Sequence, residues 1–458
     1  MSRFRPAFHL SPPTGWLNDP NGLVYYRGEY HLFYQWCDAL QIDVTKMHWA
    51  HAVSTDLVRW KHLPHAIAPG DECAIWSGSA VVDSSNTSGF FNGGEGLVAA
   101  YTEFKKLANP ERTTEKQGIA FSRDNGRTWT KYDDNPVLTC GNHKDFRDPK
   151  VFWHAPTQRW IMIIGVEQQL YASTNLREWQ YLSHTGLKSE CPDMFSLPIE
   201  NEASRKWVIS LGGVEYSVGE FNGSRFTHDG PPIQVDHGGD FYASQSWENA
   251  PDGRRIWLAW MSQWKYAGKV PDFGARGLMT VPRELSLRRM PGGALRLVQR
   301  PVPELSSLRK ECLIERARIG GSSERLFASD TFEIRASLRP AGGGSCGFRV
   351  LASKDCETVI GFDDVRVVGF VDRERCGSDV TTGVFTAPVR KIDGRVDVQI
   401  FVDRCSVEVF FNGGETVFSN LVFPREGARD ATWFSSNGSS AAERCMAHSM
   451  EDVASYSC

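Results

Sequence analysis

The apolar residues of this chain occur in short runs that are bounded by Gly, Pro, Asn and Asp. Residues 159–165, 206–211 and 254–261 are such runs, and each has the length of a β-strand. Residues 22–26 and 29–34 flank an Arg-Gly turn, which predicts a hairpin. Helical periodicity over about eleven residues or more is nearly absent. The pattern therefore predicts an all-β fold.

One short pattern returns three times in the first 300 residues. Residues 52–60 (AVSTDLVRW), 120–129 (AFSRDNGRTW) and 171–179 (YASTNLREW) each combine an apolar strand, a polar turn and a Trp. The three Trp residues lie 69 and 50 residues apart, which suits successive sheets of several strands each. A radial array of such sheets is a β-propeller. The alternative is that three similar turns coincide by chance.

The pattern changes near residue 300. Residues 299–312 begin QRPVPEL and are the predicted linker between a propeller over residues 1–298 and a second domain over residues 313–458. In this second domain, residues 397–411 alternate between apolar and polar positions around an Asp-Arg turn. Alternation of this kind predicts an antiparallel meander, and the domain is interpreted as a β-sandwich.

Composition excludes several classes of function. The chain has 458 residues, is 41% apolar and 23% charged, and carries a formal net charge of −4, so nothing favours binding to nucleic acid or an anionic membrane. No apolar run approaches the roughly 18 residues of a membrane span. The first residues, MSRFRP, do not resemble a secretory signal, and eleven Cys without CxxC spacing indicate reduced thiols. A cytoplasmic protein, monomer or homo-oligomer, is expected.

One segment near the N-terminus holds a carboxylate among turn-forming residues. Residues 16–22 read WLNDPNG, in which Asp19 precedes Pro20. Pro disfavours the α region for the residue before it, so Asp19 is expected in extended backbone within a rigid turn. Taken alone, a solvated Asp in a hairpin turn is the simpler interpretation.

Two further acids have similar surroundings. Asp148 lies in the segment FRDP, and Glu190 lies in SECPD, which also holds Asp193. Arg147, next to Asp148, offers a positive charge that keeps an acid ionised. The loops on one face of a propeller converge on its axis, so Asp19, Asp148 and Glu190 are expected to meet there. A pair of carboxylates across a glycosidic bond is the recurring means of hydrolysing it.

Aromatic residues near these acids would suit the apolar faces of sugar rings, although core packing is the alternative for each one. The candidates are Trp16, Trp36, Trp49, Trp76 and Trp264. His48 and His51 have a spacing that metal ligands use, but no third ligand stands out, so no metal is predicted.

The three acid-bearing segments resemble the signature blocks of glycoside hydrolase family 32, which holds invertases, levanases, inulinases and fructosyltransferases. Residues 77–80 (SGSA), 236–245 and 282–285 (PREL) also fit the pattern of that family. Residues 403–410 (DRCSVEVF) resemble the signature of its C-terminal sandwich. The resemblance spans nearly the whole chain. It implies a five-bladed propeller followed by a β-sandwich, in agreement with the repeats.

The resemblance also implies an activity and a set of roles. The activity is that of a retaining, exo-acting β-fructofuranosidase, which hydrolyses sucrose or related small β-D-fructofuranosides by double displacement without a metal or organic cofactor. Asp19 would be the nucleophile, Glu190 the acid/base and Asp148 the stabiliser of the transition state. The Asp19 and Glu190 carboxyl groups would stand roughly 5–5.5 Å apart. The fructosyl pocket would be lined by Asn18, Gln35, Trp76, Ser77, Arg147 and Trp264.

One block departs from the family pattern. Where the family usually has Trp-Gly-Asn, this chain has Val44, Thr45 and Lys46. The exchange removes an aromatic ring and adds a cation, and Lys is a point-charge binder of anions. One hypothesis is that Lys46 recognises a sulfonate or phosphate group on the fructosyl unit. The alternative is that Lys46 reaches solvent, the commonest fate of Lys.

Two other functions remain open from the sequence. A fructosyltransferase would use the same acids and differ only in its acceptor. A non-catalytic carbohydrate-binding propeller would be expected to lack at least one of the three acids, and all three are present.

Overall fold

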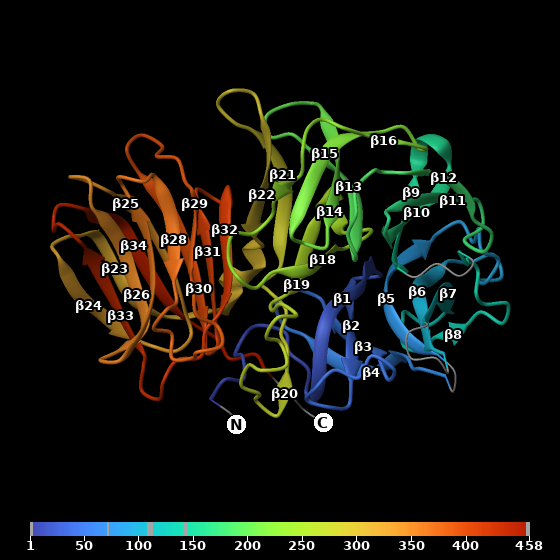
Figure 1. Ribbon diagram of the computed structural model, residues 1–458, viewed down its shortest axis with the longest axis horizontal. Helices are drawn as coiled ribbons and strands as arrows, with labels where there is room; N and C mark the ends of the chain where they lie inside the picture. The colour runs from blue at the N-terminus through green and yellow to red at the C-terminus, as the bar shows by residue number, and fades with distance from the viewer. Residues whose placement is uncertain (1–2, 71–72, 108–112, 141–144, 455–458) are drawn as a thin grey trace.

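The computed structural model describes residues 3–70, 73–107, 113–140 and 145–454. Within these residues it contains 34 strands in seven sheets (Figure 1). The helical segments in this part are short 3-10 turns: η1 (Ala155–Thr157), η2 (Pro251–Gly253) and η3 (Pro303–Leu308). The prediction of an all-β protein is confirmed.

Five sheets follow one another along the first two thirds of the chain. The first holds β1 (Gly15–Tyr26), β2 (Glu29–Cys37), β3 (His48–Ser54), β4 (Lys61–Ile67) and β20 (Ala275–Arg276). The second holds β5 (Ala74–Asp83), β6 (Gly96–Lys106), β7 (Thr113–Ser122) and β8 (Thr130–Lys131). The third holds β9 (Phe146–His154), β10 (Arg159–Val166), β11 (Gln169–Ser173) and β12 (Gln180–His184).

The fourth and fifth sheets complete this unit. The fourth holds β13 (Pro192–Pro198), β14 (Arg205–Leu211), β15 (Glu215–Phe221), β16 (Phe226–His228) and β17 (Ile233–Gln234). The fifth holds β18 (Tyr242–Ser246), β19 (Ile256–Trp260), β21 (Arg283–Arg289) and β22 (Leu295–Pro301).

The first strands of the five sheets form a closed ring. β1 contacts β5, β5 contacts β9, β9 contacts β13, β13 contacts β18, and β18 contacts β1 (Figure 1). A main-chain hydrogen bond of 2.9 Å from Tyr25 to Glu248 joins the first and last sheets. The five sheets are therefore the blades of a propeller with these strands innermost, as the repeats predict.

The repeated Ser-x-Asp or Ser-x-Asn pattern forms the same turn in the first three blades. In each blade the third strand ends at a Ser whose hydroxyl bonds the side chain two residues on. That side chain in turn accepts main-chain N–H groups of the following residues. The three Ser residues are Ser54, Ser122 and Ser173. The matched turns explain why the sequence pattern recurs.

Two six-stranded sheets form the rest of the chain, a β-sandwich, as predicted. One holds β23 (Arg309–Ile319), β34 (Ala441–Met450), β25 (Phe332–Arg339), β30 (Val396–Asp403), β31 (Ser406–Phe411) and β32 (Thr416–Leu421). The other holds β24 (Ser323–Ala328), β33 (Asp430–Ser435), β26 (Ser345–Ser353), β27 (Cys356–Asp363), β28 (Val368–Asp372) and β29 (Val384–Pro388).

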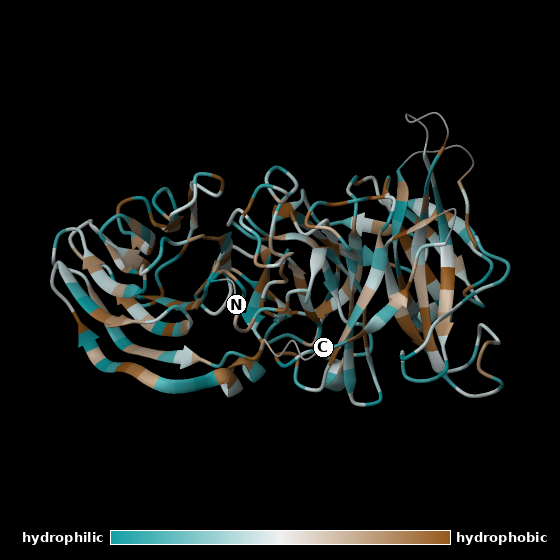
Figure 2. Cartoon of the chain, turned by 90° about the horizontal axis from the view of Figure 1, so that it is seen from below, coloured by the Kyte–Doolittle hydropathy of each residue, from teal (hydrophilic) through white to brown (hydrophobic). Residues whose placement is uncertain are grey.

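The core of the sandwich lies between its two sheets. Phe332 and Phe418 of one sheet are fully buried in the same cluster as Phe348 and Trp433 of the other. Apolar and polar positions alternate along these strands (Figure 2), as expected for sheets with one face in the core. The segment 299–312, expected as a linker, contains the end of β22, η3 and the start of β23.

A buried charge network holds the sandwich against the propeller. Asp403 of the sandwich accepts a hydrogen bond of 2.8 Å from the main-chain N–H of Ala7. The imidazole of His9 lies between Asp403 and Glu408, at 2.8 and 2.9 Å. Glu408 also pairs with Arg283 of the fifth blade at 2.6 Å. All four ionisable side chains are essentially inaccessible to solvent, so the two units are fixed relative to each other.

The described residues include no helix that is long and apolar enough to cross a membrane. The buried cysteines carry free thiols, in line with the prediction from their spacing: Cys37, Cys191, Cys346, Cys356, Cys376, Cys405 and Cys445. Cys458 lies outside the described residues.

Candidate active site

A cavity of about 200 Å³ opens at one end of the ring of innermost strands. Side chains from the beginnings of β5 and β9, from the first half of β1 and from the segment before β13 line this cavity. The residues that line it are Asn18, Asp19, Gln35, Ile42, Val44, Met47, Trp76, Ser77, Arg147, Asp148, Glu190 and Trp264. The three acids and six of the seven pocket residues expected from the sequence therefore come together. Lys46 is the exception.

The backbone around Asp19 differs from the expected turn. Residues 16–22 belong to strand β1, and the pairing of β1 with β2 is irregular after Leu17 and again after Asn21. Such irregularities re-aim side chains and are frequent next to active sites. Gly22 has a φ of +56°, and an added Cβ would lie 2.6 Å from the Phe33 ring, so only glycine fits there.

The Asp19 carboxylate is buried and accepts two close hydrogen bonds, besides a longer contact of 3.5 Å with the Cys191 thiol. The amide of Asn18 donates to Oδ1 at 3.0 Å, and the hydroxyl of Ser77 donates to Oδ2 at 2.7 Å. Burial raises the pKa of Asp19 above its ordinary value, and the negative charge of Glu190 adds to that effect. The two donors act in the opposite direction because they favour the charged carboxylate. Asp19 is thus oriented for a reaction but poorly solvated.

Asp148 is the second buried acid of the cavity. Although it lies within β9 and precedes a proline, its φ is +62°, in the left-handed region. Burial raises its pKa to about 7, which outweighs the opposing charge of Arg147, whose Nε lies 3.8 Å from Oδ2. The charges of Asp19 and Glu190 raise the pKa further. The charge of Arg147 acts in the expected direction and lowers the pKa of Asp148, but burial outweighs it.

Arg147 connects the acids of the cavity to the second blade. Its guanidinium lies 2.8 Å from Asp145, 3.2 Å from the buried Glu115 and 3.6 Å from Glu190. Glu115 is fixed in turn, because it accepts a hydrogen bond of 2.8 Å from the main-chain N–H of Phe146. The positive charge is thereby held at the wall of the cavity.

Glu190 differs from the other two acids in its exposure. It lies two residues before β13, and its side chain is 36% exposed. The hydroxyl of Tyr242, on β18, donates a hydrogen bond of 2.7 Å to Oε1. Asp193, three residues later, does not line the cavity. It is fully buried and pairs with Lys150 at 3.2 Å. Glu190 is thus the acid with both a fixed orientation and access to solvent.

Cys191 links the two buried acids. Its main-chain N–H donates to Oδ2 of Asp148 at 2.9 Å, and its thiol lies 3.5 Å from Oδ2 of both Asp19 and Asp148. Burial and the neighbouring carboxylates raise the pKa of the thiol well above its ordinary value. Cys191 is therefore a neutral donor. No pattern in the sequence indicates a role for Cys191 or Tyr242, although Cys191 directly follows Glu190.

Only two of the five candidate Trp residues line the cavity. Trp76 stacks on Phe104 at 3.7 Å, and Trp264 is 44% exposed. The other candidates, Trp16, Trp36 and Trp49, are buried in the core clusters. For these three the sugar-facing interpretation is wrong, because their rings fill the space between and within blades.

Gln35 lines the cavity and has an unpaired nitrogen in its side-chain amide. Its side-chain nitrogen is buried, and no hydrogen-bond partner for it exists among the described residues. Buried polar groups are nearly always paired, so this nitrogen is an exception at the wall of the cavity.

The segment that departs from the family pattern forms an apolar wall. Ile42, Val44 and Met47 line the cavity. The Lys46 side chain is 75% exposed, and its Nζ lies 3.5 Å from Asp43. The hypothesis that Lys46 reaches into the pocket has no support, because the side chain points to solvent while its neighbours point inward.

No group of three or more His, Cys, Asp or Glu side chains is placed to hold a metal ion in the part of the chain that the structure describes. The cavity chemistry therefore consists of three carboxyl groups, one guanidinium, two amides, a hydroxyl and aromatic or aliphatic surface.

Two models of one protein family match nearly the whole chain. The model of the glycosyl hydrolases family 32 N-terminal domain matches residues 9–301, and that of the family 32 C terminal matches residues 304–449. The levanase of Bacillus subtilis strain 168 is 40% identical over 98% of this chain and 71% of the levanase. The extracellular exo-inulinase of Aspergillus awamori is 32% identical over 95% of this chain and 92% of the inulinase.

A solved structure agrees with these matches. The crystal structure of exo-inulinase from Aspergillus awamori superposes with a TM-score of 0.90, at 31% identity, and the match covers 99% of each chain. The chain therefore belongs to glycosyl hydrolase family 32 and is a glycoside hydrolase of the β-fructofuranosidase type.

Proposed function

We propose that this enzyme is a retaining, exo-acting β-fructofuranosidase that removes single fructosyl units from neutral fructosides. The observation that carries the proposal is that Asp19, Asp148 and Glu190 line one small cavity in different environments. Two are buried, while Glu190 is partly exposed. Retaining glycosidases need one carboxylate that attacks and one that exchanges protons with the leaving group and with water.

The size of the cavity supports exo action. Its volume of about 200 Å³ is below the roughly 300–1,000 Å³ of pockets that enclose drug-sized ligands. One sugar ring is the natural occupant of such a space. Gln35 and Asn18 supply amide groups for its hydroxyls, and the Trp76 ring supplies an apolar face.

In the first step, an oxygen of Asp19 forms a bond to the anomeric carbon of the fructosyl unit. The bond from that carbon to the glycosidic oxygen breaks, and this oxygen takes the proton of Glu190. Asn18 and Ser77 hold the attacking carboxylate in place, since they bond both of its oxygens. The hydrogen bond from Tyr242 orients Glu190 for the proton transfer.

In the second step, Glu190 removes a proton from a water molecule. The water oxygen attacks the same carbon, and the bond to Asp19 breaks, which regenerates both carboxyl groups. Two inversions give net retention of configuration. The exposure of Glu190 suits this step, because water must reach it after the leaving group has departed.

Asp148 does not form a covalent bond in this scheme. Its carboxyl group, held by the main-chain N–H of Cys191, is positioned to hydrogen-bond fructosyl hydroxyls as positive charge develops on the ring. Arg147 lies beside both Asp148 and Glu190 and balances negative charge on either of them.

The composition of the cavity favours a neutral fructosyl unit over an anionic one. An ionised Asp19, which the proposed attack requires, repels an added negative charge, and the segment of Ile42, Val44 and Met47 offers apolar surface instead of cations. Arg147 is the one cation among the lining residues, and it is already paired with acids.

The proposal is tested by product analysis with sucrose, levan and inulin. Free fructose should appear as the sole early product from each polymer. Fructan fragments of intermediate length as early products would contradict exo action. Larger saccharides formed at high sucrose would show that the enzyme transfers fructose to a sugar in preference to water.

A further inference from the structure

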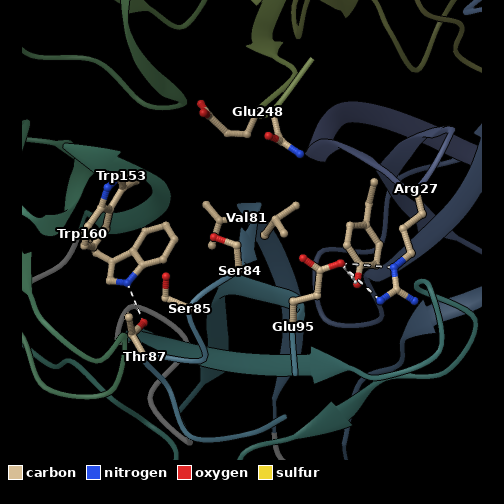
Figure 3. A pocket seen from close by; sticks show the side chains of 12 residues that line it. Arg27, Val81, Ser84, Ser85, Thr87, Glu95, Trp153, Trp160 and Glu248 are labelled. Atoms are coloured by element: carbon tan, nitrogen blue, oxygen red, sulfur yellow. Dashed lines mark hydrogen bonds and ion pairs between the residues drawn. The ribbon is translucent and has the colours of Figure 1, made fainter. Parts of the chain in front are cut away.

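A second cavity, of about 550 Å³, opens at the opposite end of the ring of innermost strands (Figure 3). Tyr26, Val81 and Trp153, which line it, lie near the ends of β1, β5 and β9, and Glu248 follows β18. Strands rise about 3.3 Å per residue, so Trp153 lies about 16 Å along β9 from Asp148. We call this the distal cavity.

The distal cavity and the catalytic cavity have no lining residue in common. Between them, on β9 and β13, lies the buried ion pair of Lys150 and Asp193, whose side chains are 1% and 0% exposed. A ligand in the distal cavity therefore does not contact the three acids. Such a ligand would affect catalysis by holding a large substrate near the enzyme.

The charged groups that line the distal cavity are already paired within the protein. Arg27 and Glu95 form an ion pair at 3.2 Å (Figure 3). Glu248 lies 3.2 Å from Lys150 and 3.0 Å from Arg255. Because each charge has a counter-charge, the cavity has no electrostatic preference for an anion or a cation. Its ligand is expected to be neutral.

The remaining lining groups suit a polyhydroxylated ligand. The Trp153 ring is 42% exposed and packs edge-on against Trp160 at 5.0 Å, while Trp160 is fixed by a hydrogen bond of 2.9 Å to Thr87. Figure 3 shows the two Trp rings on one side of the cavity, with the hydroxyls of Ser84 and Ser85 beside them. An exposed aromatic face next to hydroxyls is the surface that a sugar ring requires.

We propose that the distal cavity is a non-catalytic binding site for a neutral polysaccharide. The choice of fructan as its ligand rests on the proposed function of the catalytic cavity. The site would hold the enzyme on a polymer while chain ends are removed at the other end of the propeller. Small substrates would gain nothing from it.

The kinetic test compares Trp153→Ala with wild type on sucrose and on levan. The variant should raise KM for levan about 3-fold to 10-fold, the range that loss of one aromatic contact gives. Its kcat/KM for sucrose should match that of wild type. Tyr181→Ala is the matched control, since Tyr181 is 50% exposed on β12 but does not line the cavity. Equal KM values for levan in Trp153→Ala and wild type would overturn the proposal.

A binding measurement separates this site from the catalytic one. In native gels containing levan, the Asp19→Asn protein should be retarded, and adding Trp153→Ala should remove most of that retardation. Ser84→Trp fills the cavity and keeps Trp153. Adding it to Asp19→Asn should also reduce the retardation. No retardation of Asp19→Asn, or equal retardation in all these variants, would overturn the proposal. The gel reports binding even if wild type fails to hydrolyse fructosides, so the two proposals fail independently.

Discussion

The hydroxyl of Ser77 on the second blade donates a hydrogen bond of 2.7 Å to Oδ2 of Asp19 on the first blade. Asn18 binds the other carboxylate oxygen at 3.0 Å. These two donors oppose the burial that raises the pKa of Asp19. A contact between two adjacent blades therefore favours the ionised form of the proposed nucleophile, against the effect of burial.

Ser77→Ala should move the acidic limb of the kcat/KM profile to higher pH. Loss of a donor to a carboxylate favours the protonated form, so the pKa of Asp19 rises and less of it is ionised at a given acidic pH. A hydrogen bond to a charged group contributes about 1.5–3 kcal/mol, which corresponds to a shift of about 1–2 pH units. The profile is measured with sucrose, and Ser77→Thr, which keeps a hydroxyl, is the control. If kcat/KM falls by the same factor at every pH and the acidic limb stays at the same pH, the role given to Ser77 is contradicted.

Cys191 should resist alkylation although it lies in the active site. The thiolate is the reactive form of cysteine, and burial next to two carboxylates raises the pKa of the Cys191 thiol well above its ordinary value. Treatment with iodoacetamide near neutral pH should label the exposed Cys312 and leave both Cys191 and the activity intact. Peptide mapping by mass spectrometry identifies the labelled residues. Rapid inactivation with label on Cys191 would show that the thiol is more acidic than its surroundings imply.

Lys46→Ala should leave substrate selection unchanged. The ammonium group faces solvent and pairs with Asp43, so its removal alters no contact inside the cavity. The ratio of kcat/KM for sucrose to kcat/KM for a fructoside with a phosphate on the fructosyl unit should equal that of wild type within about 2-fold, since surface ion pairs contribute little. A large decrease in kcat/KM for the anionic substrate alone would support the hypothesis that Lys46 recognises an anionic group.

The charge network around His9 should make the stability of the protein fall at alkaline pH. Burial alone lowers the pKa of His9, but hydrogen bonds and charge from Asp403 and Glu408 outweigh it and raise the pKa from 6.5 to about 9. The protonated form therefore stabilises the folded state fully below about pH 6.5, and this contribution is lost as the pH rises through about 9. It amounts to about 3 kcal/mol.

The test of this network is chemical denaturation of wild type and His9→Asn at about pH 6 and pH 10. The free energy of unfolding of wild type should exceed that of the variant at pH 6 by clearly more than at pH 10. A difference between the two proteins that does not change with pH would mean that His9 is neutral in the folded state.

The general architecture and the three acids follow from the sequence, since both depend on local patterns. The Ser54, Ser122 and Ser173 turns identify repeated blades, because one side-chain and main-chain arrangement recurs in each. Asp19, Asp148 and Glu190 stand in short segments whose residue order alone marks them. Their convergence follows from the closed ring of innermost strands.

Contacts between blades could not be derived in this way. Tyr242 lies 52 residues after Glu190, and only the packing of the fifth blade against the fourth brings its hydroxyl to Glu190. Residues before proline are ordinarily extended, so the positive φ of Asp148 could not be predicted. Whether the Lys46 side chain faces the cavity or solvent depends on the fold of an irregular segment. No periodicity in that segment distinguishes buried from exposed positions.

In the proposed mechanism, Asp19 attacks the anomeric carbon and forms a covalent fructosyl intermediate. This intermediate can be trapped with Glu190→Gln and β-D-fructofuranosyl fluoride, whose leaving group needs no acid. Without a base to activate water, the intermediate should accumulate, and mass spectrometry should show one fructosyl unit on the peptide that contains Asp19. A label on Asp148 or another residue, or release of fructose by this variant with no label at any time, would contradict the account.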